Sequence, residues 1–144
     1  MKIKCIIIDD EPLSRKGLSV FIEEMDFLQL EGSFSNPLEA MTFLEANPVD
    51  LILLDIQMPK MNGLDFLKTM RNPPVTIITT AYPNFAVQSY EFNVIDYLIK
   101  PVPFERFVKA ITKSREYLKL INSTEKPGIN STPYFFIKCD SRIE

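Results

Sequence analysis

Residues 3–12 read IKCIIIDDEP, an apolar run that ends in an acidic cluster and a proline. The run from Ile3 to Ile8 has the length and the β-branched composition of a buried strand. Pro12 suits the first turn of a helix, and apolar residues follow it at helical spacing. We expect one face of this helix to carry Leu13, Leu18, Phe21, Ile22 and Met25. The chain therefore begins with a strand followed by a helix.

The same alternation continues to about residue 121. The sequence predicts further strands at 27–34, 51–54, 75–79 and 95–99. It predicts further helices at 37–46, 64–70, 84–92 and 104–121. Strands that alternate with helices form a parallel sheet with right-handed crossovers and a helix layer on each face. The predicted fold class is therefore α/β, a flavodoxin-like (βα)5 three-layer sandwich with the strand order 2-1-3-4-5.

The composition excludes several classes of protein. A length of 144 residues suits one compact domain with a tail, and a net charge of -3 provides no basic surface for nucleic acid or anionic lipid. The absence of histidine excludes histidine-based nucleophilic catalysis and histidine-rich zinc sites. Cys5 and Cys139 lie far apart, and the sequence has neither a secretory signal nor an apolar run of membrane-spanning length. These features predict free thiols, a cytoplasmic location and no membrane association.

The composition changes after residue 121. Residues 122–133 are polar and punctuated by Pro and Gly, which is typical of a linker. We therefore expect the first domain to cover residues 1–121. Residues 134–144 open with the strand-like sequence YFFI but are too few to form a packed unit. We interpret them as the truncated start of a second domain.

Polar residues follow four of the predicted strands. Asp9 and Asp10 follow the first strand, Asp55 the third, Thr80 the fourth and Lys100 the fifth. Ligands of open α/β sheets bind at the carboxyl ends of the strands, and the predicted order makes the first, third and fourth strands neighbours. Each residue taken alone has a structural interpretation, such as a helix N-terminus, a loop cap or a turn. Their common position at the strand ends predicts one site.

Carboxylates gathered in one site repel each other, and a pair about 4 Å apart costs on the order of 4 kcal/mol at an effective dielectric constant of roughly 20. Lys100 supplies one compensating charge, and a divalent cation supplies two. Oxygen donors alone favour Mg²⁺, for which Asp9 and Asp10 are the candidate ligands. A carboxylate beside Mg²⁺ and lysine is also a nucleophile for phosphoryl transfer. Asp55 is the candidate, with Thr80 and Lys100 placed to bind phosphoryl oxygens.

These motifs resemble the receiver domain of two-component response regulators over about residues 1–121. They read IIIDDE at 6–11, LLDIQMP at 53–59, ITTA at 78–81 and DYLIKP at 96–101. The resemblance implies that Asp55 accepts a phosphoryl group from a sensor histidine kinase. It also implies that Mg²⁺ is held by Asp9, Asp10, Asp55 and the backbone carbonyl of Gln57.

The resemblance further implies how the site signals. Thr80 and Lys100 would bind the phosphoryl oxygens, and Tyr97 would change rotamer between two states together with Thr80. The bond from Lys100 to Pro101 would be cis. Such a domain is not an enzyme with a separate substrate, because it supports only its own phosphorylation and dephosphorylation.

The resemblance extends to partners. The face formed by helix 84–92, strand 95–99 and helix 104–121 would report the signal and is a candidate homodimer surface. The tail from residue 134 is similar to the opening of a LytTR-type DNA-binding domain, so the chain resembles the N-terminal part of a LytTR-type transcriptional regulator. We expect contact with DNA only through the missing C-terminal domain.

Two other functions remain open from the residues alone. A Mg²⁺-dependent phosphohydrolase that passes through an aspartyl phosphate would use the same chemistry. One such type places its nucleophile in an Asp-x-Asp pattern, which neither Asp9 nor Asp55 begins. A flavodoxin-like nucleotide or flavin-binding module is the other alternative, although the sequence has no glycine-rich phosphate loop.

Overall fold

The structure is a computed structural model that describes residues 2–83 and 93–124. Residues 1–114 form one compact unit, and residues 115–144 belong to a second unit. The predicted helix at 84–92, the tail from residue 134 and most of the predicted linker lie outside the described residues.

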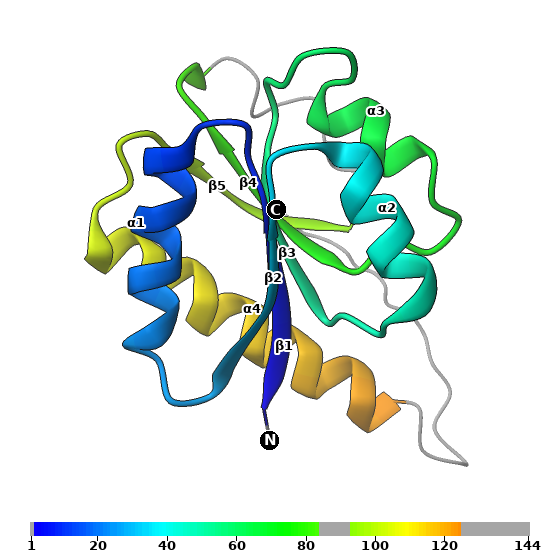
Figure 1. The fold of residues 1–144 in the computed structure, drawn as a ribbon. Helices are drawn as coiled ribbons and strands as arrows, with labels where there is room; N and C mark the ends of the chain where they lie inside the picture. Colours follow the sequence, from blue (N-terminus) through cyan, green and yellow to red (C-terminus); the bar gives the residue numbers. More distant parts are fainter. Residues whose placement is uncertain (1, 84–92, 125–144) are drawn as a thin grey trace. The chain divides into compact units, whose positions relative to one another are not determined.

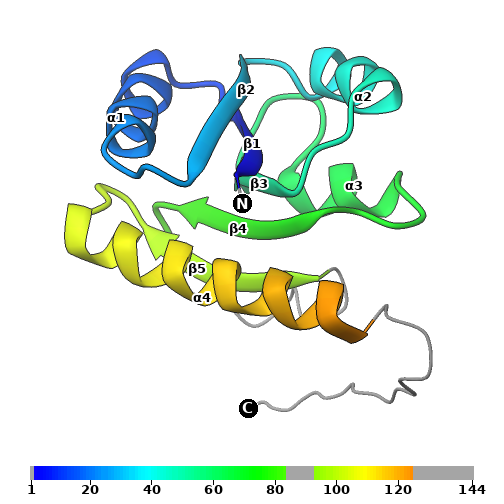
Figure 2. The same ribbon diagram turned by 90° about the horizontal axis from the view of Figure 1, so that it is seen from below.

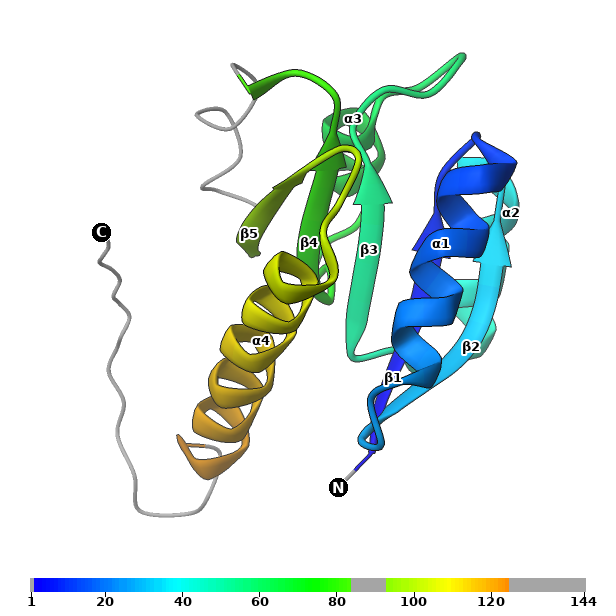
Figure 3. The same ribbon diagram turned by 90° about the vertical axis from the view of Figure 1, so that its left-hand side faces the viewer.

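The strands are β1 (Ile3–Ile8), β2 (Leu28–Phe34), β3 (Leu51–Asp55), β4 (Val75–Thr80) and β5 (Val94–Ile99). The helices are α1 (Pro12–Glu23), α2 (Pro37–Ala46), α3 (Gly63–Lys68) and α4 (Phe104–Thr124). Neighbouring strands are parallel, and their order is β2-β1-β3-β4-β5. Figure 1 shows the fold, and Figure 3 shows this order across the sheet. The predicted α/β class and strand order are therefore confirmed.

Helices cover both faces of the sheet, as Figures 1 and 2 show for α1 and α2 on opposite sides of β1. On one face, α2 and α3 pack on β1, β3 and β4 through a cluster of buried residues that includes Ile6, Ile52, Leu54, Ile78, Ala40 and Phe66. On the other face, the ring of Phe21 in α1 lies 5.1 Å from that of Phe104 and 5.3 Å from that of Phe107, at the start of α4. The predicted three-layer arrangement follows from these contacts.

Proline and asparagine residues mark where three of the helices begin. Proline occupies the first turn of both α1 and α2, where its missing N–H removes no helical hydrogen bond. The side chain of Asn36 accepts a 2.8 Å hydrogen bond from the Leu38 N–H, and that of Asn62 accepts one of 2.8 Å from the Asp65 N–H. These bonds satisfy amide groups that a helix N-terminus leaves without a partner.

The predicted apolar face of the first helix is wrong at two positions, because α1 ends at Glu23, before Met25, and because Leu13 faces solvent. Leu18 and Ile22 are buried in α1, but Leu13 is 84% exposed. Leu13 stands five positions before Leu18, which turns it by roughly 140° around a helix with 3.6 residues per turn. The two side chains therefore point in different directions, and only the later part of α1 supplies the core.

Besides the end of α1, two helix ends differ from the sequence prediction. α3 ends at Lys68, before Met70, because the N–H groups of Thr69 and Met70 bond to carbonyls three residues earlier and tighten the turn. α4 continues to Thr124, beyond the end expected near residue 121. Both differences are local and leave the order of elements unchanged.

The thiol of Cys5 is free and buried, as predicted. Burial raises its pKa to about 12, so it stays protonated and behaves as a small apolar side chain. Cys139 lies outside the described residues. Among residues 2–83 and 93–124, no helix combines the length and the apolar character that crossing a lipid bilayer requires.

Replacing Thr79 by Val is expected to raise the free energy of unfolding by about 1 kcal/mol. The Thr79 hydroxyl is buried and has no hydrogen-bond partner among the described residues, and a buried polar group without a partner destabilises the folded state. Thr76→Val is the matched control, because the Thr76 hydroxyl donates to the Pro74 carbonyl at 2.9 Å. Urea unfolding of both variants tests this. A loss of stability in Thr79→Val as large as in Thr76→Val would contradict it.

Candidate functional site

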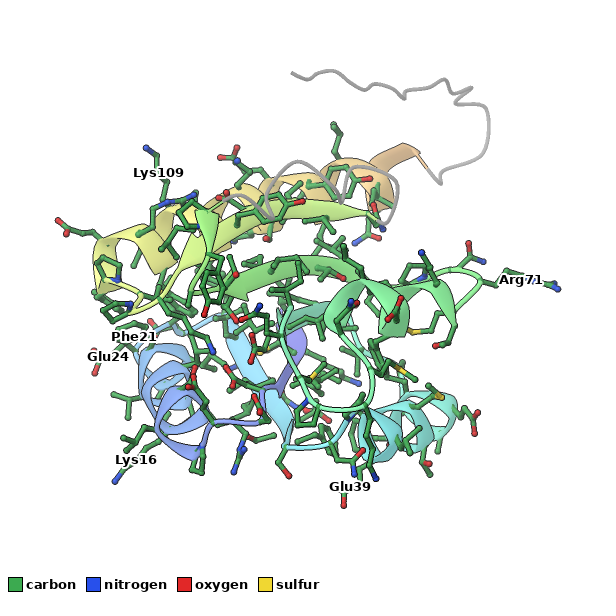
Figure 4. The ribbon with its side chains drawn as sticks, turned by 90° about the horizontal axis from the view of Figure 1, so that it is seen from above. Lys16, Phe21, Glu24, Glu39, Arg71 and Lys109 are labelled. Atoms are coloured by element: carbon green, nitrogen blue, oxygen red, sulfur yellow. The ribbon has the colours of Figure 1, made fainter. Side chains whose placement is uncertain are left out.

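Four polar residues stand at the carboxyl ends of four strands, the edge that Figure 4 views from above. Asp9 follows β1, Asp55 ends β3, Thr80 ends β4 and Lys100 follows β5. Asp9, Asp55 and Thr80 are buried, with 0%, 3% and 0% of their surface exposed. Polar residues at this depth need partners, so their contacts identify what the site is built to hold.

Lys100 is the cation of the site. Its Nζ lies 2.8 Å from Glu11 Oε1, 3.1 Å from Asp9 Oδ2 and 3.3 Å from Asp55 Oδ2. Burial alone would lower the pKa of Lys100, but the hydrogen bond to Glu11 and the charges of Asp55 and Asp9 raise it above its usual value. The side chain therefore remains charged between the carboxylates. The bond from Lys100 to Pro101 is cis, as the sequence resemblance implies.

Asp9 is held by several donors on the first turn of α1. Its Oδ1 accepts a 2.9 Å hydrogen bond from the Glu11 N–H, and its Oδ2 accepts one of 2.6 Å from the Ser14 hydroxyl. The Arg15 guanidinium donates to the Asp9 backbone carbonyl at 2.8 Å. These bonds fix the orientation of the carboxylate toward Lys100. No sequence signal singled out Ser14 or Arg15 in advance.

Asp55 is a buried carboxylate with two partners among the described residues, the Gln57 N–H and Lys100. Its Oδ1 accepts a 3.1 Å hydrogen bond from the Gln57 N–H, and its Oδ2 faces Lys100. Burial raises the pKa of Asp55 to about 7, and the nearby charge of Asp9 adds to this, while Lys100 and the Gln57 N–H oppose it. A further positive charge would therefore stabilise the ionised form.

The site has the donors for a hard cation. One carboxylate oxygen from each of Asp9, Asp10 and Asp55 lies within 4.8 Å of the others. The cluster offers only oxygen ligands, which is the donor set of Mg²⁺. Burial is the main cause of the raised pKa of Asp55, and the charge of Asp9, which adds to it, is what such an ion would neutralise. The residues present therefore fit Mg²⁺.

The site opens to solvent through a hollow of about 610 Å³. Its lining includes Asp10, Glu11, Asp55, Gln57, Tyr82 and Lys100. Gln57 and Asp10 also line a second hollow. A small anion entering the first hollow would meet Asp55 and Lys100.

Thr80 lies on the neighbouring strand, and its hydroxyl bonds to the backbone after β4. It accepts from the Tyr82 N–H at 3.0 Å and donates weakly to the Tyr82 carbonyl at 3.4 Å. The Thr80 carbonyl accepts from the Lys100 N–H at 2.8 Å, which joins the ends of β4 and β5. In this structure the hydroxyl is therefore turned toward the loop.

Tyr97 in β5 packs against the buried cluster that lies between the sheet and the helices α2 and α3. The carboxylate of the neighbouring Asp96 accepts hydrogen bonds from Nη1 and Nη2 of Arg106, at 3.0 and 2.8 Å. Arg106 also donates to the Tyr97 carbonyl at 3.0 Å. Burial alone would raise the pKa of Asp96, but the bonds from Arg106 and from the Tyr97 N–H lower it. Sequence reasoning missed this pair, which ties β5 to α4.

The structure thus brings Asp9, Asp10, Asp55 and Lys100 together. Thr80 lies at the end of β4, and Tyr97 lies in β5, three residues before Lys100. Their roles stay predictions. The ion pair between Glu11 and Lys100 was not predicted, although the position of Glu11 beside Asp9 and Asp10 is a signal that it belongs to the site.

Residues 5–112 match the family model described as the response regulator receiver domain. The chain is 34% identical over 116 residues to the transcriptional regulatory protein BtsR of Escherichia coli (strain K12), covering 79% of this chain and 48% of that protein. It is 34% identical over 134 residues to the sensory transduction protein LytR of Staphylococcus haemolyticus, covering 91% of this chain and 52% of that protein. The chain therefore spans about half the length of these relatives.

A solved structure supports the same relationship. The response regulatory domain of protein mrkE from Klebsiella pneumoniae has a TM-score of 0.75 and 30% sequence identity, covering 82% of this chain and 99% of that chain. Almost the whole of that domain therefore corresponds to the part of this chain that carries the site.

Proposed function

Because the chain belongs to the receiver domain family of two-component response regulators, we propose that Asp55 is its phosphoacceptor. The donor is a phosphohistidine of a sensor histidine kinase, which suits a chain without histidine. The observation that carries the proposal is the 3.3 Å contact between Asp55 Oδ2 and Lys100 Nζ, at a carboxylate whose side chain is 4% exposed. This contact supports the proposal because a positive charge beside the acceptor oxygen would stabilise the incoming phosphoryl oxygens.

In the transfer, one Asp55 carboxylate oxygen forms a bond to phosphorus, and the bond from phosphorus to the histidine nitrogen breaks. The electron pair of the broken bond stays with that nitrogen. Lys100 balances charge on the phosphoryl oxygens, and the Thr80 hydroxyl donates a hydrogen bond to one of them. The protein's contribution is thus positioning and positive charge.

We assign Mg²⁺ binding to Asp9, Asp10, Asp55 and the backbone carbonyl of Gln57. The ion, when bound, would supply two positive charges against those of the carboxylates and the phosphoryl group. The all-oxygen cluster of three carboxylates supports this assignment.

Phosphorylation then acts through Thr80 and Tyr97. To reach a phosphoryl group, the Thr80 hydroxyl must leave the Tyr82 backbone. This rearrangement opens space at the end of β4, and Tyr97 turns into it. The response is carried by the face that combines residues 84–92, which lie outside the described part, with β5 and α4; the same face is the proposed homodimer surface.

The whole protein is proposed to be a LytTR-type transcriptional regulator. The likeness to LytR covers 91% of this chain, more than residues 1–121 can supply, but only 52% of that longer relative. This supports a linker at 122–133 and an output domain that begins near residue 134 and binds DNA. The kinase partner and the free thiol of Cys5 suit the cytoplasmic location that the sequence predicts.

Incubation with acetyl phosphate and Mg²⁺ tests the function. Intact-mass analysis is expected to show one added phosphoryl group per chain, and none when the metal is removed by a chelator. The reason is that, among residues 2–83 and 93–124, Lys100 is the one cationic side chain in contact with Asp55, so the metal has to supply the remaining positive charge. Equal labelling with and without the chelator would contradict the proposed site.

A further inference from the structure

We propose that Glu11 is a positioning residue that restrains Lys100 and thereby slows phosphorylation of Asp55. The inference rests on the proposed function and deepens it. It concerns a residue outside the set that carries the chemistry.

The backbone of Glu11 is fixed at both ends. Its N–H donates to Asp9 Oδ1 at 2.9 Å, and its carbonyl accepts the first helical hydrogen bond, from the Arg15 N–H at 3.0 Å. Glu11 occupies the N-cap position of α1, yet its side chain makes no capping hydrogen bond. The carboxylate is directed instead at Lys100, with Oε1 2.8 Å from Nζ.

Glu11 differs from the other two partners of Lys100. Its contact of 2.8 Å is shorter than those of Asp9, at 3.1 Å, and Asp55, at 3.3 Å. Its side chain is 62% exposed, whereas those of Asp9 and Asp55 are 1% and 4% exposed. Water can therefore solvate Glu11 when it releases Lys100, whereas the two aspartates have no such alternative.

In this arrangement the single positive charge of Lys100 interacts with three carboxylates at once. A phosphoryl donor that enters the hollow needs Lys100 to face its oxygens, so the contact with Glu11 must weaken first. Glu11 also lines the hollow with Asp55 and Lys100, so its negative charge repels the anionic donor. Both effects act in the same direction and slow the approach to Asp55.

The test is the second-order rate constant for phosphorylation by acetyl phosphate at saturating Mg²⁺. Glu11→Gln keeps the length of the side chain and removes its charge. We expect its rate constant to exceed that of the wild type by about two- to fivefold at low salt, the range that an exposed ion pair accounts for. The ratio of the two rate constants should fall toward one as ionic strength approaches 1 M, where the Debye length is about 3 Å.

Glu24→Gln is the matched control. Glu24 is exposed, follows α1 at its other end, and its side chain points away from the sheet in Figure 4. The substitution Glu24→Gln removes one negative charge, as Glu11→Gln does, but at a residue that does not contact Lys100. We expect a rate constant equal to that of the wild type, and an unchanged unfolding transition in both variants.

Three outcomes overturn the inference. They are a rate constant for Glu11→Gln equal to or below that of the wild type, an equal gain in Glu24→Gln, and a gain that does not depend on salt. Each of these leaves Asp55 as the acceptor if the wild type is labelled and Asp55→Asn is not. Absence of labelling in the wild type, in contrast, refutes the proposed function itself.

Discussion

Asp55→Asn is expected to abolish phosphoryl labelling by acetyl phosphate, from one group per chain in the wild type to none. Asparagine has nearly the same shape as aspartate, so the fold and the contacts of Lys100 with Asp9 and Glu11 are retained. Its amide nitrogen and carbonyl oxygen are poor nucleophiles toward phosphorus compared with a carboxylate. The loss therefore reports the missing reactive oxygen. Intact-mass analysis in the presence of Mg²⁺ measures it.

Asp26→Asn is a suitable control for this variant. Asp26 is exposed in the loop after α1 and contacts Lys2 only through its backbone carbonyl in the hydrogen bonds of the described part. It should label like the wild type. Labelling of Asp55→Asn to the wild-type extent would show that another residue accepts the phosphoryl group.

Asp55→Asn is also expected to stabilise the metal-free protein at pH 8, by on the order of 3 kcal/mol. Burial and the charge of Asp9 raise the pKa of Asp55 to about 7, above its value in the unfolded chain. The folded state therefore binds this proton more tightly than the unfolded state does. The associated stability is complete below about pH 4 and is lost as the pH rises through about 7.

Urea unfolding at pH 5 and pH 8 in the presence of a chelator measures the effect. The wild type should lose stability between the two values, and Asp55→Asn should lose less, because asparagine does not titrate. Added Mg²⁺ should stabilise the wild type more than the variant, since the ion neutralises the charge that Asp55 carries. A lower stability of Asp55→Asn at pH 8 would contradict this account of the site.

These two predictions describe one compromise. Asp55, the proposed acceptor, lies where burial and Asp9 disfavour its charge, and Lys100 compensates for only part of that cost. The proposed function requires this charge, whereas the stability of the metal-free chain would favour its removal. A site that served only to hold the fold together would not be built in this way.

The sequence predicts the central residues of the site well, for a topological reason. Asp9, Asp55 and Lys100 each follow an apolar strand, and parallel strands place their carboxyl ends on one edge. Once the strand order is known, their proximity needs no knowledge of side-chain rotamers. The strands themselves are readable because β1 and β3 are buried on both faces and consist almost entirely of apolar residues.

Contacts that depend on the rotation of a helix or on long side chains are not predictable in the same way. Ser14 reaches Asp9, and Leu13 faces solvent, because of how α1 is rotated about its axis. The pair of Glu11 with Lys100 joins residues 89 positions apart through two flexible side chains. The spacing of the two residues in the sequence therefore does not predict this contact.

The most direct test of the central claim is to locate the phosphoryl group on the chain. After labelling with acetyl phosphate and Mg²⁺, reduction with borohydride converts an aspartyl phosphate to homoserine, and trypsin then separates residues 5–15, which hold Asp9 and Asp10, from residues 17–60, which hold Asp55. We predict homoserine at position 55 and nowhere else. Homoserine at position 9 or 10, or at any position other than 55, would contradict the account.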